Sequence, residues 1–133
     1  MRLLLDTHSF IWALTEPKKL TITARSAIED PDNEAFVSAV TLWEIAVKTR
    51  INKLDLGGIS NDDLTALAKK IGITSIALTP EEAETYGNLL ENTHTDPFDR
   101  MLIWQAISRK MVLISKDSHF EKFVPDGLRL LWK

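Results

Sequence analysis

Residues 2–14 read RLLLDTHSFIWAL, and this stretch contains the unit from which the rest of the fold can be predicted. The short apolar run Arg2–Leu5 is typical of a buried strand, and it stops at an acid, Asp6. Along Ser9–Leu14 the apolar residues recur at helical spacing, and Pro17 follows shortly afterwards. We therefore expect a strand, a turn that carries a carboxylate, and a helix.

The same alternation of strand and helix continues along the chain. Apolar spacing, capping residues and breaks at glycine or proline predict further helices at 24–29, 39–50, 62–71, 80–91 and 99–110, and further strands at 35–38, 73–78, 111–115 and 128–132. Asn61 is expected to cap the helix at 62–71, and Asp99 to begin the helix at 99–110. Because parallel strands need long crossovers, which are usually helices, the pattern predicts the α/β class with a mainly parallel sheet covered on both faces.

The composition limits the kinds of protein that this chain can be. Its 133 residues, 44% of them hydrophobic, suit one packed domain over residues 1–133. No stretch reaches the roughly 18 uninterrupted apolar residues of a membrane helix, so we expect a cytoplasmic protein without membrane contact. The lack of cysteine excludes disulfides, thiolate metal sites and cysteine nucleophiles. The net charge of −3 argues against broad nonspecific binding of nucleic acid.

Four acidic residues follow predicted strands or stand at helix starts. Asp6 follows the first strand, and Asp117 comes two residues after the strand that ends at Ser115. Glu44 lies in the helix after the second strand, and Asp99 stands at the start of a later helix. Ligands of open parallel sheets bind beyond the carboxyl ends of the strands, where the loops converge. The positions of Asp6 and Asp117 at this edge follow from the pattern, whereas spacing alone does not place Glu44 and Asp99 beside them.

Such a cluster of carboxylates would need a cation, because like charges in one pocket repel each other. With no cysteine and no histidines at ligand spacing, the sequence favours a hard ion, Mg²⁺ or Mn²⁺. A bound ion could activate a water molecule, neutralise a scissile phosphate and stabilise the leaving oxygen. An acidic chain could then bind RNA locally if basic side chains rim the site, and Lys48, Arg100 and Lys116 are the candidates.

Simpler structural roles exist for each of these residues taken singly. Asp6 and Asp99 could cap helices, Glu44 could pair with Lys48 one turn later, and Asp117 could serve a turn. Only their joint placement favours a metal site. The tryptophans on apolar helical faces are expected in the core or in subunit contacts, with base stacking less favoured; these are Trp12, Trp43 and Trp104, and Trp132 is expected in the core.

Four motifs, in this order, resemble those of PIN domains, and most closely the VapC-type toxins of bacterial toxin–antitoxin pairs; they are Leu3–His8, Val37–Ala46, Asp96–Arg100 and Leu113–Asp117. The resemblance implies an α/β/α sandwich, Mg²⁺- or Mn²⁺-dependent endoribonuclease activity on RNA, a cognate antitoxin and a homodimer. Carried over by motif, Asp6, Glu44 and Asp99 match the three acids of the family, and Asp117 matches a fourth of more variable role. Asp96 is an additional acid without an assigned part, and Ser115 matches a hydroxyl position that could orient a ligand or water.

Two other functions share part of this pattern. A PIN-domain nuclease of RNA maturation or decay would use the same chemistry without an antitoxin. A phosphoacceptor signalling domain is also α/β and binds Mg²⁺, but it needs adjacent acids after its first strand and an acid at the end of a middle strand. Here Asp6 is followed by Thr7, and Val37-Ser38 supplies no acid. The sequence therefore favours the nuclease.

Overall fold

The computed structural model describes residues 1–133 and contains one five-stranded sheet with strand order β3-β2-β1-β4-β5. Every neighbouring pair of strands is parallel, which confirms the predicted α/β class. The strands are β1 (Arg2–Leu5), β2 (Glu34–Ser38), β3 (Ile73–Ile76), β4 (Val112–Ile114) and β5 (Arg129–Leu131). The α-helices are α1 (Thr7–Thr15), α2 (Ile22–Glu29), α3 (Ala39–Arg50), α4 (Leu64–Lys70), α5 (Pro80–Thr85) and α6 (Pro97–Ser108). Short 3-10 helices are η1 (Pro17–Lys19), η2 (Asn61–Asp63), η3 (Tyr86–Asn88) and η4 (Ser118–Asp126).

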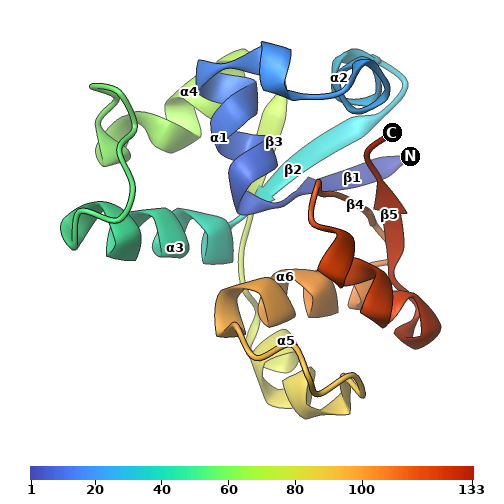
Figure 1. Cartoon of the computed structure of the whole chain (residues 1–133). Coiled ribbons are helices and arrows are strands. Elements are labelled where there is room, and N and C mark those ends of the chain that lie inside the picture. Colours follow the sequence, from blue (N-terminus) through green and yellow to red (C-terminus); the bar gives the residue numbers. More distant parts are fainter.

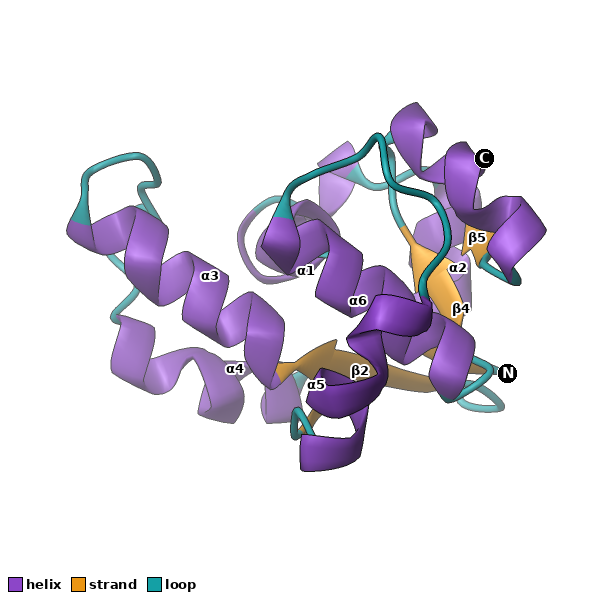
Figure 2. Cartoon of the chain, turned by 90° about the horizontal axis from the view of Figure 1, so that it is seen from below, coloured by secondary structure: helices purple, strands orange, loops and turns teal.

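Alternate residues of each strand pack into two separate apolar layers, because successive side chains of a strand point to opposite faces. In β1, Leu3 and Leu5 join the layer under α1, α2 and α4, whereas Leu4 joins the layer under α6 and η4. Figure 1 shows the first group of helices above the sheet and α5, α6 and the C-terminal turns below it. Figure 2 looks from the side of α5 and α6, with α3 extending away from the sheet. No helix is long and apolar enough to cross a membrane.

The central strand β1 and its neighbour β4 send their chains to opposite faces of the sheet. The chain after β1 forms α1 on one face, and the chain after β4 forms η4 on the other. A parallel sheet has a crevice at such a point, because the two loops separate there instead of packing against each other. In this protein the residues at that point are Asp6, directly after β1, and Asp117, shortly after β4.

Several predicted element boundaries were wrong, and each error has a local cause. Ser60, not Asn61, caps the helical segment at 61–70, since its hydroxyl accepts from Asp62 N at 3.3 Å. The helix predicted at 80–91 ends at Thr85 and continues only as η3, which contains Gly87. The last long helix begins at Pro97, two residues before the predicted start. The segment η4 was not predicted at all.

Candidate active site

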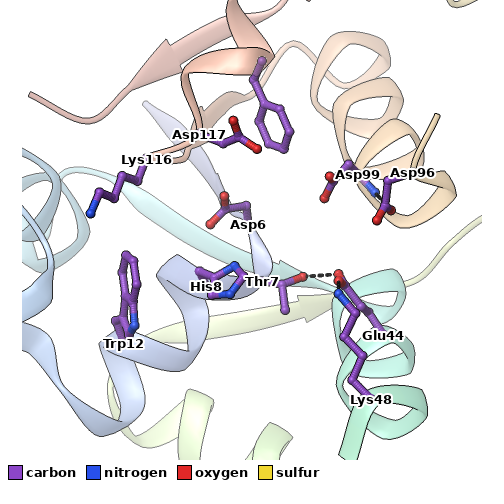
Figure 3. A pocket seen from close by; sticks show the side chains of 11 residues that line it. Asp6, Thr7, His8, Trp12, Glu44, Lys48, Asp96, Asp99, Lys116 and Asp117 are labelled. Carbon is purple, nitrogen blue, oxygen red and sulfur yellow. Dashed lines mark hydrogen bonds and ion pairs between the residues drawn. The ribbon is translucent and has the colours of Figure 1, made fainter. Parts of the chain in front are cut away.

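A cavity of about 370 Å³ opens at the carboxyl ends of β1 and β4 and is lined mainly by charged side chains. Figure 3 shows its acidic side chains directed toward a common space from α3, α6 and the turns after β1 and β4. The residues that line it are Asp6, Thr7, His8, Trp12, Glu44, Lys48, Asp96, Asp99, Lys116, Asp117 and Phe120. The four acids singled out in the sequence therefore face one pocket, and their role as metal ligands stays a prediction.

Asp6 is held at the centre of the pocket by its position directly after β1. Its backbone N–H donates to Ile114 O at 3.0 Å, which ties the turn to β4. Its Oδ1 accepts from Ser9 N at 2.9 Å and so caps α1, which is the structural role that the sequence suggested for Asp6. Burial raises the pKa of the Asp6 carboxyl, and the hydroxyls of Ser115 and Ser9 only partly oppose this effect. A buried carboxylate with a raised pKa lacks a compensating positive charge.

Glu44 reaches the pocket from the second turn of α3 and is only 3% exposed. The Thr7 hydroxyl donates to its Oε1 at 2.5 Å, and the ammonium group of Lys48 pairs with its Oε2. The start of α3 is fixed by Ser38, whose hydroxyl accepts from Val40 N at 3.0 Å. The predicted pairing of Glu44 with Lys48 is thus present, together with a contact from Thr7 that spacing did not indicate.

Asp96 and Asp99 occupy the first turn of α6. Asp96 is the cap, and its Oδ1 accepts from Phe98 N at 2.9 Å and from Asp99 N at 3.0 Å. Asp99 is therefore not the capping residue, and its carboxylate is free to face the pocket. Burial, together with the nearby charges of Asp96 and Glu44, raises the pKa of Asp99 to about 6. The Nε2 atom of His94 lies 3.0 Å from Asp99 Oδ2, so His94 belongs to the site although the sequence shows no partner for it at ligand spacing.

Asp117 lies at the outer side of the pocket and also caps η4. Its Oδ1 accepts from His119 N at 2.9 Å, and the His119 ring lies at the same distance. Burial alone would raise the pKa of Asp117, but these contacts with His119 lower it. The hydroxyl of Ser115 accepts from Asp117 N at 3.1 Å and so shapes the turn. The turn role and the pocket position therefore coexist in this residue.

Two of the three basic residues expected at the rim lie there, and the third does not. Lys48 and Lys116 line the pocket. Burial alone would lower the pKa of Lys48, but Glu44, Asp96 and Asp99 raise it. Arg100 does not line the pocket, and its guanidinium instead donates to the Tyr86 hydroxyl and to carbonyls that precede α6. The partners are Tyr86 Oη at 2.8 Å, Glu91 O at 2.5 Å, His94 O at 3.0 Å and Leu89 O at 3.4 Å.

The donor set fits a hard divalent cation. Its ligand atoms are carboxylate oxygens, and burial raises the pKa of Asp6 and of Asp99, where Asp96 and Glu44 add repulsion, so a bound cation would favour the ionised form of both. No group of three or more histidine, aspartate and glutamate side chains is arranged to hold one ion jointly. Water would therefore complete the coordination of a bound ion, and Mg²⁺ commonly keeps several of its waters in proteins.

Comparisons with known proteins agree with this fold. A model of the PIN domain matches residues 3–124. Ribonuclease VapC22 of Mycobacterium tuberculosis is 32% identical over 114 residues, which cover 86% of this chain and 85% of that protein.

Two solved structures are similar in fold. VapBC2 from Rickettsia felis, bound to a promoter DNA fragment, has a TM-score of 0.66 at 16% identity, with 100% of both chains covered. VapBC-1 from nontypeable Haemophilus influenzae has a TM-score of 0.65 at 17% identity, with 98% of this chain and 97% of that one covered. The acids gather where the chains after β1 and β4 separate, and the family model covers nearly the whole length. This chain therefore belongs to the PIN-domain family.

Proposed function

We propose that this protein is a metal-dependent endoribonuclease that acts as the toxin of a toxin–antitoxin pair. The observation that supports the activity most directly is the gathering of Asp6, Glu44, Asp99 and Asp117 in one pocket. The relative at 32% identity is named a ribonuclease, and the two similar structures are of VapBC proteins. Because such an enzyme meets its RNA in the cytoplasm, we place its action there.

In the proposed mechanism, Asp6, Glu44, Asp99 and Asp117 would hold Mg²⁺ or Mn²⁺ partly through the ion's own waters, since no three of these side chains are arranged to bind one ion directly. When bound, the ion would lower the pKa of a water molecule, neutralise the scissile phosphate and stabilise the leaving oxygen. The protein prepares the site before RNA arrives. The Thr7 hydroxyl donates a hydrogen bond to Glu44 Oε1 and so orients that carboxylate, while the contact with His94 orients the carboxylate of Asp99. Lys116 is exposed and forms no ion pair, so its ammonium group is available to a phosphate.

We further propose that the partners are an antitoxin and a second copy of this chain. An acidic pocket attracts a basic side chain for the same electrostatic reason that it attracts a cation. An apolar groove lies beside it, between α3, α5 and α6. Trp43 is 61% exposed there and contacts the ring of Phe98 edge-on, with the ring centroids 5.0 Å apart. A large exposed aromatic surface of this kind suits a protein interface.

Cleavage of a structured RNA by the purified protein, with Mn²⁺ present, tests the activity. Asp6→Asn and Asp99→Asn should each remove cleavage while the protein stays folded, because the amide keeps the shape of the carboxylate but lacks its charge. Asp32→Asn is the matched control, since Asp32 is an exposed turn residue outside the pocket. A chelator should also stop cleavage. Full activity of the Asp6→Asn protein would refute the proposed mechanism.

The toxin role is tested by growth. The chain is expressed alone, then with the product of a short adjacent reading frame, and compared with Asp6→Asn at equal expression. Growth arrest that requires Asp6 and is relieved by the partner is the expected result. If neither wild type nor variant affects growth while the purified protein cuts RNA, the protein is a PIN-domain nuclease of RNA maturation or decay.

A further inference from the structure

One end of the acidic pocket is built from an aromatic ring and a free cation. Trp12 lines the pocket there together with His8 and Lys116, on the side away from Glu44 and Lys48 (Figure 3). Lys116 Nζ lies 5.9 Å from the centre of the Trp12 ring. The indole of Trp12 packs against the core, as expected, but it is only partly buried.

A second aromatic ring continues this surface beyond Lys116. The centroids of Trp12 and Trp132 lie 6.0 Å apart, and their planes are tilted by 50°. Trp132 lines a neighbouring cavity together with Ser118 and the exposed Lys133. Lys116 and Asp117 line both cavities, so the acidic pocket and the second cavity adjoin at these residues.

Both tryptophans are anchored on one side and accessible on the other. Each packs against the apolar layer that contains Leu3 and Leu5, yet each also lines a cavity. An aromatic side chain held in this way loses little conformational entropy when a ligand binds to it. Lys19, Lys116 and Lys133 surround the rings and are exposed, although Lys19 pairs with Glu16 at 3.4 Å, and Asp117 and Glu121 also line the second cavity. Lys116 and Lys133 form no ion pair and are therefore the cations available to an RNA backbone beside the rings.

We infer that Trp12 and Trp132 form a stacking platform for unpaired bases of single-stranded RNA, with Lys116 contacting the phosphate between the platform and the acidic pocket. The inference rests on the proposed function, since it assigns the substrate of the same site. Proteins bind single-stranded nucleic acid by combining aromatic rings with a positively charged path for the backbone. Flat rings alternating with cations suit a strand of bases joined by phosphates better than they suit a peptide.

The test measures the affinity of a fluorescent single-stranded RNA of about eight nucleotides by anisotropy. All proteins carry Asp99→Asn, so that the RNA is not cut. Trp12→Leu should weaken binding at least about fivefold, which corresponds to about 1 kcal/mol, whereas Trp12→Phe should retain most of the affinity. Trp104→Leu is the matched control, because Trp104 is partly buried, as Trp12 is, but lies outside both cavities, and it should leave the dissociation constant unchanged.

A second pair of variants does not depend on the packing of a tryptophan. Lys116→Gln should reduce the dependence of log affinity on log salt concentration by about 0.7, the value for one phosphate contact in a single strand. Lys70→Gln, an exposed lysine at the end of α4, should leave this slope unchanged. Because Lys116 is exposed, this substitution remains informative even if Trp12→Leu reduces folding.

The outcomes separate this inference from the proposed function. If otherwise unmodified protein with Trp12→Leu binds and cleaves RNA as well as wild type, the platform is refuted and the nuclease stands. If wild type cuts no RNA but its RNA binding still requires Trp12 and Lys116, the nuclease is refuted and the platform stands. If Trp12→Leu and Lys116→Gln weaken only the binding of the antitoxin, the surface is a protein interface and the inference is wrong.

Discussion

Replacing Asp99 by asparagine should stabilise the metal-free protein, although it should also abolish activity. The pKa of Asp99 lies at about 6, against an ordinary value of 3.8, because burial and the nearby charges of Asp96 and Glu44 disfavour its ionised form. An asparagine keeps an oxygen that faces His94 and removes the charge. The residue that we assign to metal binding is therefore a source of instability when no metal is present.

The size and pH range of this effect follow from the pKa. A rise from 3.8 to about 6 corresponds to about 3 kcal/mol at neutral pH. Because the side chain of Asp99 is 26% exposed, solvent and salt screen part of this, and we expect about 1 to 2 kcal/mol. The folded-state pKa is above the unfolded-state pKa, so the wild-type protein loses stability as pH rises from about 4 to about 6. The advantage of the variant should thus be complete above pH 6 and absent below about pH 4.

Urea unfolding of both proteins with a chelator, between pH 3.5 and 7.5, measures this difference, and Asp32→Asn serves as the control. At pH 7.5 the variant should be the more stable protein in chelator and the wild type the more stable one with Mg²⁺, since ion binding stabilises the wild type by mass action and the variant less. Equal stability of Asp99→Asn and wild type at pH 7.5 in chelator would refute the electrostatic argument. So would a difference that does not change with pH.

Three further substitutions test other parts of the structure. Thr7→Val should lower kcat by roughly tenfold with little change in the melting temperature, because it removes only the hydroxyl that orients Glu44; nuclease assays and thermal unfolding measure the two effects. Glu82→Gln should destabilise the protein at pH 7. Burial alone would raise the pKa of Glu82, but hydrogen bonds from Arg109 and other donors lower it to about 2. Its stabilising contribution is therefore complete above about pH 4.5 and is lost as pH falls toward 2, and urea unfolding across this range should show the variant approaching wild type. Leu113→Ala should cost about 2 to 5 kcal/mol in chemical unfolding, because Leu113 is fully buried in the central sheet.

The layered fold was predictable because its main signals are local in sequence. Leu3, Leu4 and Leu5 are all fully buried, as a continuous apolar run in a parallel sheet predicts. The segment η4 was missed because a 3-10 helix that contains Pro125 lacks the apolar spacing of an α-helix. The helix at 80–91 was predicted too long, since the carbonyls after residue 88 accept from Arg100, far along the chain, and not from the next helical turn.

The candidate site was predictable only in part, for a similar reason. Asp6 and Asp117 follow strands, so the topology of the sheet alone brings them to one edge. Glu44 and Asp99 reach the pocket because α3 packs against α6, and this contact depends on tertiary structure. His94 lies in a loop without any periodic pattern, and no spacing connects it with Asp99. The contacts of Thr7 and His94 with the acids therefore became visible only in the folded chain.

The hydrogen bonds of Arg100 have a consequence for how the protein opens locally. One guanidinium supplies the donors for three carbonyls of the segment between η3 and α6, which has no helix or strand of its own. The amides of this segment should exchange with solvent together, in a single opening event controlled by one side chain. Lysine offers one ammonium group and no planar fork, so it could not hold these carbonyls in the same way. Arg100→Lys, although it keeps the charge, would therefore allow the segment between η3 and α6 to unfold independently of the rest of the protein.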